Sequence, residues 1–236
     1  MIASSPPSEG TRPYRLYGRR RGRALRVGQK ALIETLLPTL QVELAAAPLD
    51  PKRLFGPGID EVWLEAGFGG GEHLAAQAEA HPHAGVIGCE VFEPGIARLL
   101  GTINERQIGN VRLFTDDARL LIAALAPKSL ARVFILFPDP WPKERHKKRR
   151  LVSSETLDGL AVAMRDEAEL RIATDDPDYA EWIAERLDAH PAFARVAMPM
   201  RPADWSPTRY EKKALVQGRA ARLFLSRRRV RNSRRP

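Results

Sequence analysis

The sequence has little of several features that mark common classes of protein. Its single cysteine, Cys89, excludes an internal disulfide, and its five histidines lack the spacing of a zinc site. No apolar run approaches 18 residues, so we expect no membrane-spanning helix, and the N-terminus lacks the apolar stretch of a signal peptide. These absences predict a protein of the reducing cytoplasm.

Positive charge is concentrated at the two ends of the chain. Residues 1–30 hold eight Lys or Arg against one acid, and residues 219–236 hold eight Arg and no acid. The remainder, 31–218, is acidic, although the whole chain carries a net charge of +9. Each basic run alone is explained as a solvated tail, but several runs around an acidic body favour a nucleic-acid partner.

Composition divides the chain into three predicted parts: a flexible basic arm over 1–28, one folded domain over 29–226 and an Arg-rich tail over 227–236. From Glu61 onward, apolar strands alternate with helices, which predicts βαβ units and a largely parallel sheet. The expected strands are 61–66, 84–90, 110–115, 131–137, 169–174, 194–198 and 219–226. The expected helices are 29–37, 72–80, 94–107, 119–125, 154–164 and 177–189.

A glycine-rich turn, 67–71, follows the first of these strands and lets a ligand approach the backbone closely. It is not the dinucleotide fingerprint, because Glu72 stands where the third glycine is required. Acids also stand at the ends of the first four strands, and each alone is explained as a helix cap. Together around a glycine turn they favour a nucleoside ligand that carries positive charge, and S-adenosylmethionine fits best. These acids are Glu65, Glu90, Asp117 (or its neighbour Asp116) and Asp139.

The segment 134–150, FILFPDPWPKERHKKRR, combines an apolar strand, a proline-stiffened turn that holds Asp139, and a basic run. Six Lys or Arg residues within 143–150 are expected to bind backbone phosphates. Trp141 within the turn either stacks on a base or packs in a local core. A carboxylate at the end of a buried strand predicts an enzyme, and the cations beside it predict a nucleic-acid substrate.

In several segments along its length, the sequence resembles the bacterial tRNA (guanine-N7-)-methyltransferase family. The segments LEAGFGGG, GCE, DDA, FPDPWPKERHKKRR, ATD and PTRYEKK occur in that family's order and spacing. The resemblance implies a Rossmann-like class I methyltransferase fold, with a mostly parallel seven-stranded sheet, an antiparallel last strand and helices on both faces. It implies methyl transfer from S-adenosylmethionine to N7 of guanine 46 in the variable loop of tRNA.

Residue by residue, the resemblance implies that Asp139 is the active-site acid, with an orienting and electrostatic role favoured over general-base work. It implies cofactor contacts from Glu65, Gly67, Gly69, Glu90, Asp117 and Asp139. It implies substrate contacts from Lys143, Asp175, Thr208, Arg209, Tyr210 and Glu211. No candidate cofactor residue lies in the arm, so removal of 1–28 is expected to leave cofactor binding intact. The stretch before 169–174 departs from the family because it lacks the usual glycine pair.

Three alternatives stay open from the sequence. An exocyclic-amine methyltransferase uses Asp/Asn-Pro-Pro-aromatic, and the order Asp139-Pro140-Trp141-Pro142 breaks that pattern. A nucleotide-dependent oxidoreductase is disfavoured by Glu72 and by the basic runs. A non-catalytic RNA-binding protein is disfavoured by the acids at four strand ends. Both a monomer and a homodimer agree with the sequence.

Overall fold

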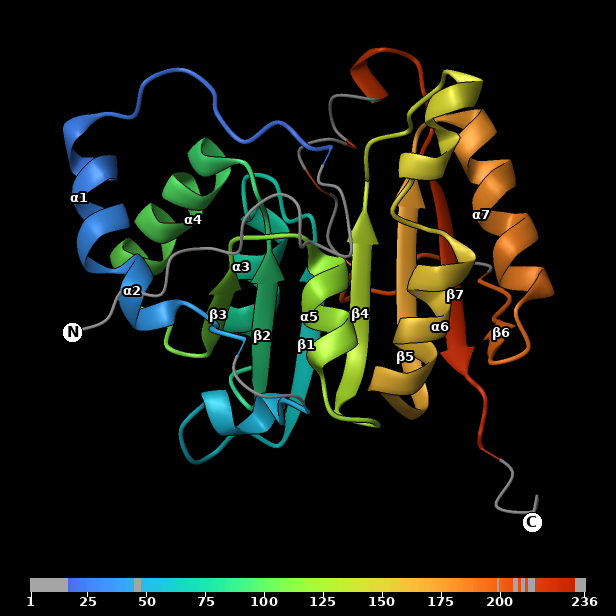
Figure 1. Ribbon diagram of the computed structural model, residues 1–236, viewed down its shortest axis with the longest axis horizontal. Coiled ribbons are helices and arrows are strands. Elements are labelled where there is room, and N and C mark those ends of the chain that lie inside the picture. Colours follow the sequence, from blue (N-terminus) through green and yellow to red (C-terminus); the bar gives the residue numbers. More distant parts are fainter. Residues whose placement is uncertain are drawn as a thin grey trace.

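The computed structural model describes residues 17–44, 48–198, 200–205, 208, 211 and 215–231. Over these residues the chain forms a sheet with helices on both faces (Figure 1), in the strand order β3-β2-β1-β4-β5-β7-β6. Strands β1 to β5 pair in parallel, whereas β7 is antiparallel to both β5 and β6. The predicted seven-stranded, mostly parallel sheet with an antiparallel last strand is confirmed.

The strand and helix bounds follow the predicted alternation closely. The strands are β1 Glu61–Ala66, β2 Ala84–Cys89, β3 Val111–Phe114, β4 Leu130–Leu136, β5 Met164–Thr174, β6 Phe193–Arg195 and β7 Arg222–Arg228. The helices are α1 Val27–Thr35, α2 Leu37–Leu40, α3 Glu72–Ala80, α4 Glu93–Arg106, α5 Ala118–Ala124, α6 Ser154–Ala163 and α7 Pro177–Ala189, with 3-10 turns η2 Pro51–Leu54 and η3 Glu144–Arg149.

Two local differences from the sequence-based expectation have clear causes. The helix expected over 29–37 ends at Thr35, and Pro38 lies instead in the first turn of α2, where its missing N–H is harmless. The chain passes from α6 directly into β5 without a glycine pair, and Glu167, within β5, itself adopts a left-handed φ of 63°. The division into arm, domain and tail stays a prediction, although β7 continues to Arg228, inside the predicted tail.

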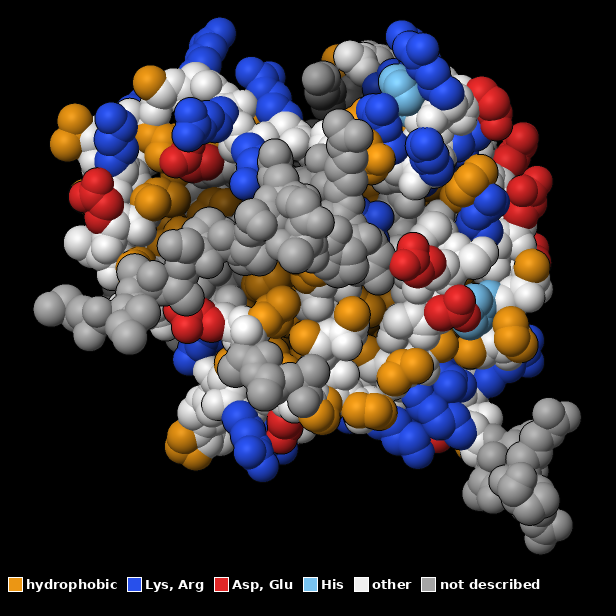
Figure 2. Space-filling model, in the orientation of Figure 1, with side chains coloured by type: hydrophobic (Ala, Val, Ile, Leu, Met, Phe, Trp, Pro, Cys, Tyr) orange, Lys and Arg blue, Asp and Glu red, His pale blue; other side chains and the backbone are white. Residues whose placement is uncertain are grey.

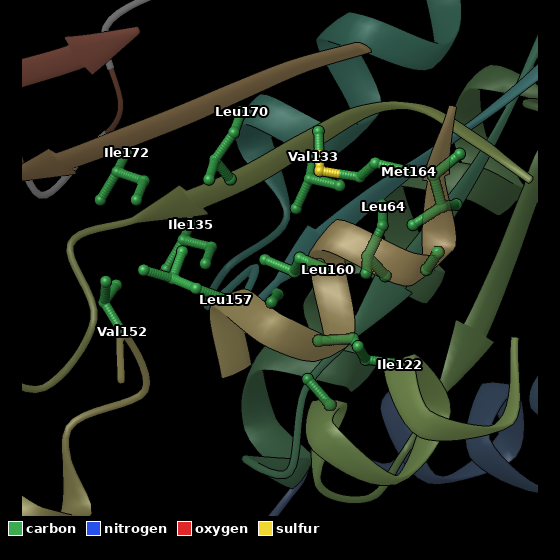
Figure 3. Close-up of a cluster of buried hydrophobic side chains, with 14 of the residues drawn as sticks. Leu64, Ile122, Val133, Ile135, Val152, Leu157, Leu160, Met164, Leu170 and Ile172 are labelled. Carbon is green, nitrogen blue, oxygen red and sulfur yellow. The ribbon is translucent and has the colours of Figure 1, made fainter. Parts of the chain in front are cut away.

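Hydrophobic side chains fill both faces of the sheet and hold it rigid. On one face, Leu64, Val133 and Ile172 from β1, β4 and β5 meet Leu157 and Leu160 of α6, all fully buried (Figure 3). The other face is covered by α3 and α4. The carboxyl ends of the parallel strands lie at the upper edge in Figure 1, so residues that follow these strands are brought together there. None of the described helices is long and apolar enough to cross a membrane.

Candidate active site

A cavity of about 390 Å³ lies at the carboxyl edge of the sheet. Its walls include Gly67 and Gly69 of the glycine turn, Glu90 after β2, Asp117 after β3 and Asp139 after β4. The structure therefore brings five of the six predicted cofactor residues to one pocket. The volume falls within the range of about 300–1,000 Å³ that small-molecule sites occupy.

The glycine turn approaches its neighbours closely. Gly67, Gly69 and Gly71 have positive φ of 81°, 58° and 80°, a conformation that side chains rarely adopt. The Gly67 N–H donates to the Cys89 carbonyl at 2.8 Å, which ties the turn to the end of β2. A Cβ atom on Gly95 of α4 would lie only 2.1 Å from the Gly69 oxygen. The turn thus seats against α4 and presents bare backbone to the pocket.

Glu90 organises this turn with its carboxylate. One oxygen accepts from the Gly69 N–H at 2.8 Å, and the other accepts from the N–H groups of Val91 and Phe92 at 2.7 and 2.9 Å. Burial raises the pKa of Glu90, the three hydrogen bonds oppose that rise, and the nearby charge of Asp139 adds to it. A carboxylate has about four acceptor positions. Glu90 therefore keeps room for a ligand hydroxyl beside its backbone partners.

The two acids after β3 are both engaged. Asp117 caps α5 by accepting from the Arg119 N–H at 3.0 Å, and its carboxylate pairs with the Arg119 guanidinium at 2.5 Å. Asp116 pairs with Arg20 of the arm at 3.4 Å. Asp117 thus fulfils the helix-cap role that the sequence also allowed, while still lining the pocket.

Asp139 lies in a strained turn. Phe137 and Trp141, two residues before and two residues after it, have positive φ of 53° and 45°. Burial raises the pKa of Asp139. Left-handed backbone at non-glycine residues is uncommon and clusters at functional sites. The turn therefore holds a partly desolvated carboxylate at the pocket wall.

Glu65 is placed differently from the other strand-end acids. It is buried, its carboxylate lies 2.8 Å from Nδ1 of the buried His73 on α3, and it is not among the residues that line the pocket. Its side chain faces the α3 side of the sheet, beneath the glycine turn. The predicted contact of Glu65 with the cofactor stays a prediction, and its observed partner is His73.

The basic run after Asp139 separates into exposed and engaged cations. Lys143, Arg145 and Lys148 are exposed and available to a polyanion. Lys147 is engaged by Glu144 and Asp178 at 2.9 and 3.1 Å.

The last two arginines of the run contact aromatic rings of the protein, and the phosphate contact expected of Arg149 stays a prediction. Arg149 lies over the rings of Tyr17 and Trp141 at 4.5 and 4.9 Å. Arg150 is buried with its side chain fully covered, so the expectation that it binds phosphate is wrong. Trp141 packs locally, because it also contacts Tyr17 and His146.

The other predicted substrate residues lie after β5 and before β7. Asp175 pairs with Arg219 at 2.9 Å, and Glu211 pairs with Arg201 at 2.7 Å. The Glu211 N–H donates to the Thr208 hydroxyl at 3.2 Å, and both residues are buried. Arg209 and Tyr210 lie outside the described residues. Of the predicted substrate residues that the structure describes, Lys143 is the one that is exposed.

Of the pocket residues that sequence reasoning missed, three belong to the predicted arm: Tyr17, Gly18 and Arg19. The arm therefore forms part of the pocket wall, and the expectation that no cofactor residue lies in it stays a prediction. The neighbouring Arg20 carbonyl accepts from the Glu93 N–H at 2.9 Å, so this stretch runs along the start of α4. A Cβ atom on Gly18 would lie 3.0 Å from Val91, and one on Gly22 would lie 2.8 Å from Pro94. Glycine at positions 18 and 22 was the feature of the sequence that could have indicated this close approach.

Acidic and glycine-rich walls suit a cationic nucleoside. The residues that the structure describes contain no group of three His, Cys, Asp or Glu arranged to hold a metal ion. The pocket offers carboxylates to ammonium, sulfonium and hydroxyl groups, and its glycine turn lets a ligand approach the backbone closely. This combination fits S-adenosylmethionine.

Comparison with known proteins agrees with this assignment. Residues 60–223 match the model of a family described as "Putative methyltransferase". The tRNA (guanine-N(7)-)-methyltransferase of Paramagnetospirillum magneticum is 54% identical over 224 residues, which cover 92% of this chain and 94% of that protein. The protein of the same name from Rhodospirillum rubrum is 46% identical over 234 residues, covering 95% and 92%.

Solved structures share the fold at low identity. The 16S rRNA methyltransferase KamB aligns with a TM-score of 0.55 at 16% identity, over 73% of this chain and 90% of that chain. The 16S rRNA (adenine(1408)-N(1))-methyltransferase from Catenulisporales acidiphilia aligns with a TM-score of 0.51 at 19% identity, over 80% and 99%. These likenesses show the class I methyltransferase fold alone. From the sequence relatives, which match it over nearly its whole length, the chain belongs to the tRNA (guanine-N(7)-)-methyltransferase family.

Proposed function

We propose that this protein methylates N7 of guanine 46 in the variable loop of tRNA, in the cytoplasm, with Asp139 as the active-site acid. The observation that carries the proposal is the position of Asp139: it lines the acidic pocket and directly precedes a run with three exposed cations. One side of the turn thus faces the cofactor site, and the other leads to a surface that suits phosphates.

Methylation of guanine N7 does not require the protein to remove a proton from the base. Guanine N7 has an in-plane lone pair and reacts without losing a proton. When bound, S-adenosylmethionine would supply a methyl group on a positively charged sulfur. The N7 lone pair forms the new bond to the methyl carbon, and the electron pair of the broken carbon–sulfur bond stays on the sulfur. The protein's task is therefore positioning, which can contribute roughly 7–11 kcal/mol to lowering a barrier.

Asp139 acts on the base in two ways. Guanine gains positive charge as N7 is methylated, and a desolvated carboxylate nearby stabilises that charge more strongly than one in water. The same carboxylate is an acceptor for the N1–H and the 2-amino group, which orients the base. Glu90 and Asp117 hold the cofactor, with Gly67 and Gly69 allowing its close approach.

The proposal also includes residues that bind the tRNA substrate. They are Lys143, Asp175, Thr208, Arg209, Tyr210 and Glu211. Figure 2 shows Lys and Arg side chains gathered at the upper left and upper right of the molecule, near the edge of the sheet that carries the pocket. Such a surface steers a polyanion toward the site.

The test is to incubate the chain with labelled S-adenosylmethionine and unmodified tRNA and then map the modified base. We expect one methyl group on N7 of guanine 46. A methyl group on an exocyclic amine would replace the proposal with the first alternative, and absence of transfer would leave only RNA binding.

Replacing Glu90 by alanine is expected to weaken S-adenosylmethionine binding by about 1.5–3 kcal/mol, the range for hydrogen bonds to a charged group. The loss combines the missing ligand contact with a loosened Gly69 turn. Glu90→Gln keeps one acceptor oxygen and is expected to lose less. Titration calorimetry measures both, with Glu105→Ala, an exposed acid of α4, as the matched control. Unchanged affinity in the alanine variant would remove Glu90 from the site.

A further inference from the structure

The strained turn that carries Asp139 needs something to hold it. Phe137 and Trp141, on either side of Asp139, both have left-handed φ. Such backbone costs free energy and persists only where the surroundings over-determine it. The Phe137 N–H donates to the Ala173 carbonyl at 2.8 Å, which secures the start of the turn to β5. The far side of the turn is secured by a residue of the basic run.

That residue is Arg150. Its Nε–H donates to the Pro140 carbonyl at 2.7 Å, one residue after Asp139. A second nitrogen, Nη2, pairs with Asp178 of α7. The guanidinium plane lies over the rings of Tyr179 and Trp182, at 4.7 and 4.9 Å from their centroids. Its neighbour Lys148, two residues earlier in the same run, is exposed instead.

The support beneath Arg150 is rigid. Tyr179 is fully buried, and its hydroxyl accepts from the Val152 N–H at 3.1 Å. The indole N–H of Trp182 donates to the Val152 carbonyl at 2.7 Å. Val152 is fully buried at the edge of the hydrophobic cluster shown in Figure 3. Arg150 therefore joins the Asp139 turn to a fixed part of the core.

We propose that Arg150 is a positioning residue, which holds the Pro140 carbonyl and so keeps the Asp139 carboxylate aimed at the reacting base. The inference rests on the proposed function and deepens it. A guanidinium suits this task because it donates in several fixed directions while it stacks on aromatic rings, which a lysine ammonium cannot do. Only part of the basic run, on this view, serves the RNA.

The test compares Arg150→Met and Arg150→Lys with the wild type in methyl transfer to tRNA. We expect turnover at saturating tRNA to fall by about 10²-fold in the methionine variant, as for a misplacement of about 1 Å. The lysine variant should lie between the two. The slope of log tRNA affinity against log salt should stay at the wild-type value, because a buried guanidinium neutralises no phosphate.

Two further variants separate this role from its alternatives. Lys148→Met, an exposed neighbour, should reduce the salt slope by roughly 0.7–0.9, the amount for one phosphate contact. Asp178→Asn removes the ion pair of Arg150 but leaves the Pro140 hydrogen bond in place, so its turnover should fall less than that of Arg150→Met. An equal fall in both variants would overturn the assignment of the effect to the Pro140 carbonyl. If Arg150→Met instead lowers the slope like Lys148→Met and keeps its turnover, Arg150 binds phosphate and the inference is overturned.

Folding of the variants is checked by circular dichroism at the assay temperature. Should the methionine variant be unfolded there, the lysine variant decides alone: reduced turnover with an unchanged slope supports the inference, and wild-type turnover overturns it. An inactive wild-type chain would overturn the proposed function together with the inference. An active wild type with unimpaired Arg150 variants overturns only the positioning role.

Discussion

Replacing Asp139 by alanine is expected to lower turnover by about 10²–10³-fold, the range for loss of one preorganised electrostatic contact. Affinity for tRNA should change far less, because the proposed phosphate contacts belong to the basic run and not to the carboxylate. The measurement is single-turnover methyl transfer at saturating cofactor and tRNA, together with filter binding of the tRNA. Near-normal turnover in the alanine variant would end the assignment of Asp139 as the active-site acid.

The asparagine variant and the pH profile refine this prediction. Asp139→Asn keeps an acceptor oxygen and should retain part of the activity if orientation of the base dominates over charge. Because burial raises the pKa of Asp139, the ionised form is lost as pH falls through a value above the usual aspartate range. Wild-type turnover should therefore decline at a higher pH than an exposed aspartate would cause. In the asparagine variant, whose side chain does not titrate, the part of the decline due to Asp139 should be absent, and only the part due to Glu90, whose pKa burial also raises, should remain.

Neutralising the exposed cations of the basic run, Lys143, Arg145 and Lys148, is expected to reduce the salt slope of tRNA binding by roughly 2 to 3 units, since each phosphate contact contributes roughly 0.7–0.9. Binding at low salt should weaken accordingly, while S-adenosylmethionine binding stays intact because none of the three lines the pocket. Filter binding at several salt concentrations gives the slope.

A matched control removes exposed cations from the opposite edge of the sheet. Lys52 and Arg53 lie in η2, before β1, and both are exposed. Replacing this pair by alanine should leave the slope near the wild-type value. Equal slopes for the triple variant, the control and the wild type would mean that the basic run is only a solvated surface.

The basic composition of the arm suggests that its deletion would test phosphate contacts alone, but the deletion also affects the pocket. Tyr17, Gly18 and Arg19 line the pocket, so removal of 1–28 takes away part of the pocket wall as well as cations. Composition marked these residues as a charged segment without periodicity, which is typical of a flexible arm. The contact of Tyr17 with Trp141, the close approach of Gly18 to Val91 and the ion pair of the neighbouring Arg20 with Asp116 form only once distant parts of the chain have folded together.

The C-terminal arginines are a second case in which composition alone did not predict the contacts of charged residues. Arg228 is buried and donates to the Ala161 carbonyl at 2.9 Å, and Arg231 donates to the carbonyls of Val162 and Met164 at 3.1 and 2.9 Å. Charge alone predicted a basic tail that suits RNA. These two side chains instead satisfy backbone oxygens at the end of α6 and the start of β5.

The sequence by itself determined the order of strands and helices, because hydrophobic periodicity and turn residues are local properties of the chain. It also located Glu90, Asp117 and Asp139, since the carboxyl ends of parallel strands meet at one edge of the sheet. Tertiary structure alone decided that Glu65 faces His73 and that Arg150 is buried while Lys148 is exposed. The physical reason is that chemically similar side chains, such as the cations of the basic run, differ in burial because different distant segments of the chain pack against them.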